Sequence, residues 1–271
     1  MKKNFKMGFI GCGKMAGAII RGLLKADFIS PSLIVASQEN AENIEERSKE
    51  LGIEIITDNR ELVIKSDVII IAVKPNQVKT VLDEISSKLD ESKLIVSVAA
   101  GVTTKFIENN IPQSCRVIRV MPNTPVLVSE GMSGIFGGKF ATSTDINIVK
   151  TIFETIGKTL ILDNEDKIDI VTAISGSGPA FFYKVINDIA LAGEKMGLDY
   201  EQALKLSIQT AIGSAKMALN RTLPMETLIS NVATKGGCTR VGVDVLEESK
   251  INEIFYNVIK ETTQKAKQLG V

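Results

Sequence analysis

The stretch Met7-Gly8-Phe9-Ile10-Gly11-Cys12-Gly13-Lys14-Met15-Ala16 decides the fold of this chain. A short apolar run ends at Ile10, and a Gly-x-Gly-x-x-Ala pattern follows it. In a strand–turn–helix unit, the first glycine permits a tight turn and the second lets the backbone approach a pyrophosphate. The small third residue lets the helix pack closely on the strand. The free N–H groups and the helix dipole favour phosphate charge. We therefore predict a dinucleotide site formed by Gly11, Gly13, Lys14, Met15 and Ala16.

Short apolar runs alternate with stretches of helical period over the first 163 residues. The expected helices include 41–51 and 76–89. The run Val68-Ile69-Ile70-Ile71-Ala72-Val73 is apolar on both faces, as in a central parallel strand covered by helices. The predicted strands are 7–10, 33–36, 54–56, 68–73, 94–98, 116–120, 132–136 and 159–162. This alternation predicts an α/β fold with a doubly wound, Rossmann-type domain over residues 1–163.

Strand-like runs stop after about Asp163, and long helical stretches replace them. A second, all-helical domain is predicted over residues 164–271. The small and apolar run Ala211-Ile212-Gly213-Ser214-Ala215 fits either an ordinary core or a dimer interface. The predicted helices are 179–196, 200–220, 239–248 and 251–269.

The composition excludes several kinds of function. Lysine plus arginine equals aspartate plus glutamate at 32 each, so charge gives no reason to expect nucleic acid or an anionic membrane as partner. The chain has no histidine, which rules out Ser-His and Cys-His nucleophiles. Its three cysteines are widely spaced, and we expect no metal site. The basic N-terminus lacks the pattern of a signal peptide, and no apolar run is long enough to span a bilayer, so we expect a cytoplasmic protein.

The end of the second strand should meet the adenosine ribose of the dinucleotide. An acidic residue there favours NAD, because it accepts from the ribose hydroxyls. Here the strand ends at Ser37, whose hydroxyl can donate to a 2′-phosphate. This favours NADPH and leaves NADH open, because Glu39 lies close by and no arginine follows. Ser37 also suits the N-cap of a helix starting near Ala41, and the two roles are compatible.

Several segments in order resemble the pyrroline-5-carboxylate reductase family over nearly the whole chain. The matching segments are Gly8 to Ala16, Ala72-Val73-Lys74-Pro75, Ser97 to Gly101, Met121-Pro122-Asn123-Thr124-Pro125, Ser175 to Ala180 and Gly236-Gly237-Cys238-Thr239. The resemblance implies a reductase that transfers hydride from NAD(P)H to a cyclic imino acid, giving proline. It also implies a homodimer with interlocked helical domains and allows further assembly of this dimer into a decamer.

The resemblance implies cofactor contacts beyond the glycine turn. Asn59 matches a position that reaches the adenosine half of the cofactor. Further positions match residues near the nicotinamide: Ala72, Val73, Lys74, Pro75, Ala100 and Asn231. Lys74 equally fits an ordinary loop lysine in solvent.

The resemblance places the substrate at the other end of the chain. Its carboxylate is expected on the backbone N–H groups of Gly237, Cys238 and Thr239, with help from the Thr234 hydroxyl. A Gly-Gly turn entering a helix is a nest of donors that suits a carboxylate. Thr239 matches the residue beside the imine nitrogen and is our candidate catalytic residue. A plain N-cap is its alternative role.

Two other segments have alternative roles. Ser177, within Ser175-Gly176-Ser177-Gly178, is a candidate lining residue of the substrate pocket, or the segment forms only a hinge. Cys238 has no histidine to activate it, and we expect it to serve in packing.

The chain departs from the family beside the substrate loop. Lys235 replaces a proline, and Leu223-Pro224 stands where His-Pro is frequent. Two rival functions remain. One is a β-hydroxyacid dehydrogenase-like reductase using Lys184 and Asn187, and the other is a regulator that binds nucleotide without catalysis.

Overall fold

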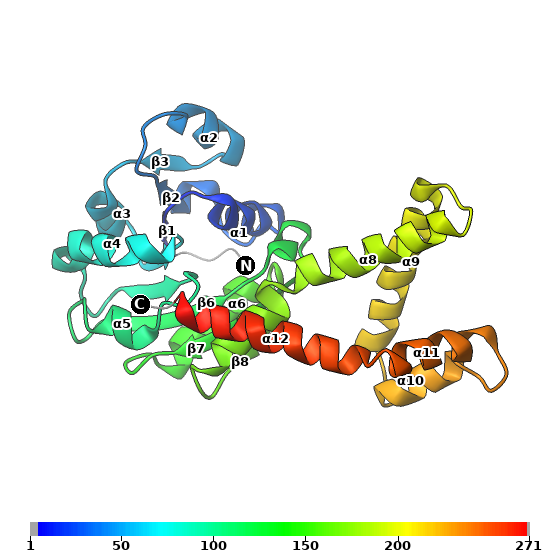
Figure 1. Ribbon diagram of the computed structural model, residues 1–271. Coiled ribbons are helices and arrows are strands. Elements are labelled where there is room, and N and C mark those ends of the chain that lie inside the picture. Colours follow the sequence, from blue (N-terminus) through cyan, green and yellow to red (C-terminus); the bar gives the residue numbers. More distant parts are fainter. Residues whose placement is uncertain (1–4, 270–271) are drawn as a thin grey trace. The chain divides into compact units, whose positions relative to one another are not determined.

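A computed structural model describes residues 5–269, and its residues up to Ile161 contain all the strands of one eight-stranded sheet (Figure 1). The sheet order is β3-β2-β1-β4-β5-β6-β7-β8. The strands are β1 (Met7–Ile10), β2 (Ile34–Ser37), β3 (Glu54–Ile56), β4 (Val68–Ile71), β5 (Leu94–Ser97), β6 (Arg116–Met121), β7 (Gly131–Gly137) and β8 (Gly157–Ile161). All eight predicted strands are present, and the predicted doubly wound α/β fold is confirmed.

The direction of the last two strands was not predicted. Strands β1 to β6 run parallel, whereas β7 pairs antiparallel with β6 and parallel with β8. A parallel crossover needs a dozen or more residues, usually including a helix. Only residues 122–130, with the short 3-10 helix η4 (Thr124–Val128), join β6 to β7. This connection is too short for a crossover, so the chain reverses.

Helices cover both faces of the sheet because its central strands are apolar on both faces. The helices in chain order are α1 (Lys14–Lys25), α2 (Ile44–Leu51), α3 (Asn59–Lys65), α4 (Val78–Ile85), α5 (Thr104–Glu108), α6 (Ser143–Glu154), α7 (Lys167–Val171), α8 (Gly178–Lys195), α9 (Tyr200–Leu219), α10 (Met225–Val232), α11 (Cys238–Glu248) and α12 (Ile251–Gln268). Helices α1 and α6 pack on one face, and α3, α4 and α5 pack on the other. Helix α10 was not predicted from the sequence.

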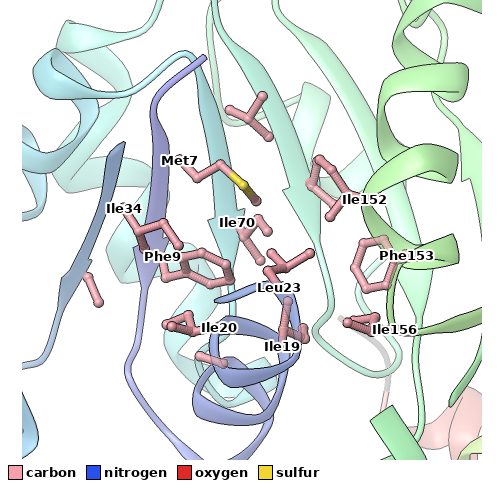
Figure 2. Packing of buried hydrophobic residues seen from close by; sticks show 14 of the residues in the cluster. Met7, Phe9, Ile19, Ile20, Leu23, Ile34, Ile70, Ile152, Phe153 and Ile156 are labelled. Carbon is pink, nitrogen blue, oxygen red and sulfur yellow. The ribbon is translucent and has the colours of Figure 1, made fainter. Parts of the chain in front are cut away.

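The larger core cluster joins α1 to the first strand. Ile19, Ile20 and Leu23 of α1 are fully buried and face Phe9 of β1 (Figure 2). Phe153 of α6 completes the cluster beside them (Figure 2). Burying each such side chain contributes about 1.5–3 kcal/mol relative to leaving it exposed. This packing holds the start of α1, and with it the glycine turn, against the carboxyl end of β1.

The chain divides into two compact units at Ser177, later than the predicted boundary at residue 163. The first unit holds residues up to Ser177 and those from Glu261 onward, and the second spans Gly178–Lys260. Buried Arg119 of β6 explains the difference. It pairs with Glu165 at 3.3 Å and with Asp169 of α7 at 3.0 Å, and Glu165 also accepts from the backbone N–H of Thr104. These pairs fix α7 to the sheet, although its residues are helical in pattern.

The second unit is all helical, as predicted. Helices α8 and α9 pack on each other through small residues: a Cβ built at Gly193 would lie 3.0 Å from Ala203 Cβ. Many large apolar side chains of this unit remain exposed, including Phe182 at 68% and Met196 at 87%. The run from Ala211 to Ala215 is exposed or half-buried. Within one chain it is therefore not an ordinary core.

Candidate functional site

The glycine turn has the geometry that its sequence predicts. Gly11 adopts a φ of +92°, and its N–H donates to the carbonyl of Ser37 at 3.1 Å. A Cβ at Gly11 would lie 2.9 Å from Ala72 O, so both the backbone angle and the space require glycine. Gly13 is the N-cap of α1 in an extended conformation, and a Cβ there would meet nothing within 4 Å. Gly13 therefore borders open space at the start of the helix.

An arginine from the next helix fastens this turn. Arg47 of α2 donates from Nε to Cys12 O at 3.0 Å and from a terminal nitrogen to Gly13 O at 3.3 Å. Two turn carbonyls are thus held toward Arg47. No local pattern in the sequence indicates this role for Arg47, since 35 positions separate it from Cys12.

A cavity of about 670 Å³ lies at the carboxyl ends of the parallel strands, where open α/β sheets bind their ligands. Its volume suits a dinucleotide or a large part of one. Predicted residues that line it are Gly11, Gly13, Ser37, Asn59, Ala72, Val73 and Lys74. Further lining residues are Ile10, Cys12, Gln38, Glu39, Asn40, Thr57, Asn76, Gln77, Thr80, Val81 and Glu84. The turn Gly11–Gly13, with the open space at Gly13, forms a glycine cradle. This glycine cradle and the cavity beside it fit a nicotinamide dinucleotide.

The other predicted cofactor residues of the first unit are not among the residues that line this cavity. Lys14, Met15 and Ala16 form the first turn of α1, and Ala16 is fully buried against the sheet. Pro75 starts the short 3-10 helix η2 (Pro75–Gln77), and Ala100 follows β5. These residues stay predictions as cofactor contacts.

A chain of hydrogen bonds lies at the end of the cavity beside β2, where the adenosine ribose was predicted. Ser37 is 1% exposed, and its hydroxyl donates to Asn59 Oδ1 at 2.6 Å. Asn59 Nδ2 in turn donates to Glu84 Oε2 at 2.7 Å. Helix α2 begins at Ile44 with Asn43 as its N-cap, so the alternative role of Ser37 as that cap is wrong. Ser37 and Asn59 were predicted and are brought together; Glu84 was missed.

Four of the five predicted substrate residues lie close together in the chain of the second unit, on the loop before α11 and in its first turn: Thr234, Gly237, Cys238 and Thr239. Gly236 has a φ of +80°, and Gly237 N–H donates to Thr234 O at 3.0 Å, which closes a tight turn. The Thr234 hydroxyl oxygen lies 3.0 Å from where a Cβ of Gly237 would be. The N–H of Gly237 is therefore engaged within the loop. The N–H groups at the first two positions of α11, Cys238 and Thr239, have no partner within the helix and stay the predicted donors for a carboxylate.

Thr239 stands at the second position of α11, and Gly237 is the N-cap. Its alternative role as an N-cap is therefore wrong. Thr239 and Cys238 are both exposed, so Cys238 does not pack within one chain, and its expected packing role stays a prediction. Asn231, near the end of α10, is also exposed. Ser177 closes the first unit after a π-helical turn, η5 (Thr172–Gly176), and its N–H donates to Thr172 O at 2.8 Å.

A second cavity of about 750 Å³ lies elsewhere in the first unit, lined by Thr104, Glu108, Gly137 and Lys139 among others. Gly137 pairs with Ile118 near the start of β6, so this cavity lies at the opposite edge of the sheet. Burial raises the pKa of Glu108, and nearby Glu165 adds to the rise. Its place away from the glycine turn separates this cavity from the cofactor cradle.

Residues 5–269 lack two further kinds of feature. No group of three or more His, Cys, Asp or Glu side chains is placed to hold a metal ion there. In the same residues, no helix has the length and apolar character needed to cross a membrane.

The doubly wound sheet, the glycine cradle and the cavity beside it define an oxidoreductase of the NAD(P)-dependent class. Comparison with known proteins narrows this class. Residues 165–269 match the family model for pyrroline-5-carboxylate reductase dimerisation, and residues 6–101 match that for NADP oxidoreductase, coenzyme F420-dependent. The pyrroline-5-carboxylate reductase of Methanosarcina acetivorans is 39% identical over 268 residues, covering 99% of both chains. That of Arabidopsis thaliana is 37% identical, covering 99% of this chain and 96% of the relative.

Solved structures agree with the sequence relatives. A pyrroline-5-carboxylate reductase from Coxiella burnetii has a TM-score of 0.92 at 32% identity and covers 99% of this chain and 100% of its own. Plasmodium falciparum pyrroline carboxylate reductase, solved with NADP bound, has a TM-score of 0.89 at 32% identity and covers 100% of both chains. The chain belongs to the pyrroline-5-carboxylate reductase family. The predicted resemblance is confirmed, and the chain carries the dimerisation domain of that family.

Proposed function

We propose that this protein reduces 1-pyrroline-5-carboxylate to L-proline with NADPH or NADH, the last step of proline synthesis. The observation that carries the proposal is similarity to pyrroline-5-carboxylate reductases over the entire chain, from the glycine cradle to the Gly236–Thr239 loop. Such a match includes the elements of both compact units.

The nicotinamide supplies the hydride that the imine carbon accepts. The glycine turn offers N–H groups to the pyrophosphate, and Arg47 holds the turn in that conformation. The loop of the second unit binds the substrate carboxylate through the free N–H groups of Cys238 and Thr239. The Thr239 hydroxyl hydrogen-bonds the imine nitrogen and passes to it a proton from water. Because a threonine hydroxyl is a weak acid, most of the rate arises from positioning the reactants.

Initial rates distinguish this function from its nearest rival. We expect turnover of 1-pyrroline-5-carboxylate with both NADPH and NADH, and none of 3-hydroxy acids with NADP⁺ or NAD⁺. Activity on the hydroxy acids alone would identify a β-hydroxyacid dehydrogenase-like enzyme. The geometry of α8 speaks against that rival: Lys184 pairs with Asp188, and Asn187 Oδ1 accepts from the Tyr200 hydroxyl at 2.9 Å.

A regulator without catalysis is the second rival. It would bind NADPH tightly and turn over no cyclic imine in the same assay. The exposed Thr239 at the start of α11 favours the enzyme, because its hydroxyl is free to meet a substrate.

The oligomer is part of the proposal. The exposed apolar side chains of the helical unit and the dimerisation match support a homodimer. Light scattering on the purified protein, set against the monomer mass of 29.3 kDa, distinguishes a dimer from the decamer that the resemblance allows. We also propose a cytoplasmic location, where biosynthetic reductases meet their NAD(P)H supply; fractionation of the source cells tests it.

A further inference from the structure

The adenosine end of the cavity carries a fixed order of donors and acceptors. A carboxylate only accepts, so Glu84 forces the NH₂ of Asn59 to face it. The amide oxygen of Asn59 must then face Ser37, and the Ser37 hydroxyl must donate to it. The hydroxyl hydrogen of Ser37 is therefore committed inside the protein. What Ser37 presents to a ligand is a lone pair.

This order suits a ribose hydroxyl better than a phosphate. A 2′-hydroxyl can donate to the Ser37 oxygen without disturbing the chain. A 2′-phosphate carries about −1.5 to −2 charges at pH 7 and has mainly acceptor oxygens. To receive the Ser37 hydrogen it must first break the bond between Ser37 and Asn59. The second amide hydrogen of Asn59 stays available, so the phosphate is hindered rather than excluded.

The charged side chains around this end of the cavity also disfavour a 2′-phosphate. Two carboxylates, Glu39 and Glu84, line the cavity, and Lys74 is the one lysine or arginine that lines it in the described part of the chain. Arg60 follows Asn59 directly, yet its Nε donates to the backbone carbonyl of Glu84 at 2.9 Å. That guanidinium is thus held on α4. The lining has one more negative than positive side chain.

We propose that Glu84, acting through Asn59 and Ser37, is a specificity-determining residue that lowers the preference for NADPH and lets NADH be used. Glu84 is a positioning residue: it orients the Asn59 amide, and its charge weakens the pull on the 2′-phosphate. The inference rests on the proposed function only in taking the ligand to be a nicotinamide dinucleotide.

Direct binding tests the inference without any turnover. NADPH and NADH are titrated separately into the purified full chain, following nucleotide fluorescence. For the native protein we expect dissociation constants within about tenfold of each other. For Glu84→Gln, the charge is removed and the Asn59 amide can turn, since a glutamine amide can also donate. The ratio of NADH to NADPH dissociation constants should then rise about tenfold, which corresponds to about 1.4 kcal/mol.

The neighbouring Asp83→Asn is the matched control. Asp83 lies on the same helix, pairs with Lys79 and does not line the cavity. The Asp83→Asn variant loses the same charge as Glu84→Gln and should leave the ratio of NADH to NADPH dissociation constants unchanged. An unchanged ratio in Glu84→Gln, an equal rise in Asp83→Asn, or a native preference for NADPH above about a hundredfold would overturn the inference.

Thermal unfolding shows whether a variant is misfolded, and an activity assay shows whether the proposed function fails independently of this inference. Glu84→Gln should unfold at the native temperature, so that a shifted ratio reports specificity and not damage. If the variant is unstable, Glu84→Met replaces it, with the same expected rise in ratio. If both nucleotides bind as expected but 1-pyrroline-5-carboxylate is not reduced, the proposed function fails while this inference stands.

Discussion

Arg47 Nε donates to the backbone carbonyl of Cys12 at 3.0 Å and so joins α2 to the glycine turn. The same guanidinium reaches Gly13 O at 3.3 Å. In the proposed complex, a pyrophosphate would accept from N–H groups of the turn that are not already bonded within the protein, as that of Gly11 is to Ser37 O. Arg47 therefore shapes the cradle without lying in the cavity.

Replacing Arg47 with alanine should weaken NADPH and NADH equally. The pyrophosphate is common to both nucleotides, so the two dissociation constants should rise together, by about tenfold for two lost charge-assisted hydrogen bonds. Fluorescence titration measures both. Arg21→Ala is the control, because Arg21 pairs with Glu50 at 2.9 Å, which Arg47 also approaches at 3.8 Å, but does not donate to the turn carbonyls. A change in the ratio of the two constants would contradict this role and would link Arg47 to the 2′-phosphate.

Alanine at the two glycines of the cradle should have different effects, one on the stability of the fold and the other on nucleotide binding. Gly11→Ala meets a φ of +92° and the carbonyl of Ala72 at 2.9 Å, so it should destabilise the fold by about 1–3 kcal/mol. Gly13→Ala has an ordinary backbone and open space, so its melting temperature should stay native while NADPH binding is lost. Thermal unfolding and titration of both variants check this pair. Native binding by Gly13→Ala would mean that the cofactor phosphates lie elsewhere.

The sequence predicted the sheet well because buried parallel strands carry a local signal. The runs at β1 and β4 are apolar on both faces and start at the predicted residues. Strand direction at β7 carries no such signal and follows from the length of its connection. The boundary between the two units could not be predicted from local sequence pattern either. It depends on ion pairs of Arg119 with Glu165 and Asp169, which are 46 and 50 positions away.

The candidate site was predictable where a strand end or a motif marks it. Gly11 and Gly13 follow β1, Ser37 is the last residue of β2, and all three line the cavity. Glu84 lies on the polar side of an amphipathic helix, where most glutamates face only water. Its role depends on Asn59, 25 positions away, and so needed the structure. Likewise, the engaged N–H of Gly237 is a property of the turn that Thr234 closes.

Glu108 should make stability depend on pH. Burial raises the pKa of this carboxyl above its usual 4.5, so its ionisation costs the folded state more than the unfolded chain. The penalty is absent below about pH 4.5 and develops as the pH rises through the folded pKa. Glu108→Gln keeps an acceptor for the N–H of Lys139 and removes the charge. It should melt at a higher temperature than the native protein at pH 7–8, with the difference vanishing toward pH 4.5.

Exposed Glu91 supplies the control for the pH series, because Glu91→Gln makes the same change of charge away from the cavity. Its melting curve should follow the native one at every pH. A gain from Glu108→Gln that is independent of pH would show that packing, and not ionisation, is responsible.

Thr239→Ala should lower turnover of 1-pyrroline-5-carboxylate about a hundredfold, the lower end for losing a group that assists proton transfer. Gly237 and not Thr239 is the N-cap of α11, so the melting temperature should stay native. NADPH binding should also be unchanged, since the glycine cradle belongs to the other unit. Thr239→Ser keeps the hydroxyl and should retain most of the activity, and Cys238→Ser tests the neighbouring position. Native turnover in Thr239→Ala would remove Thr239 from the mechanism and leave the backbone N–H groups as the substrate contacts of this loop.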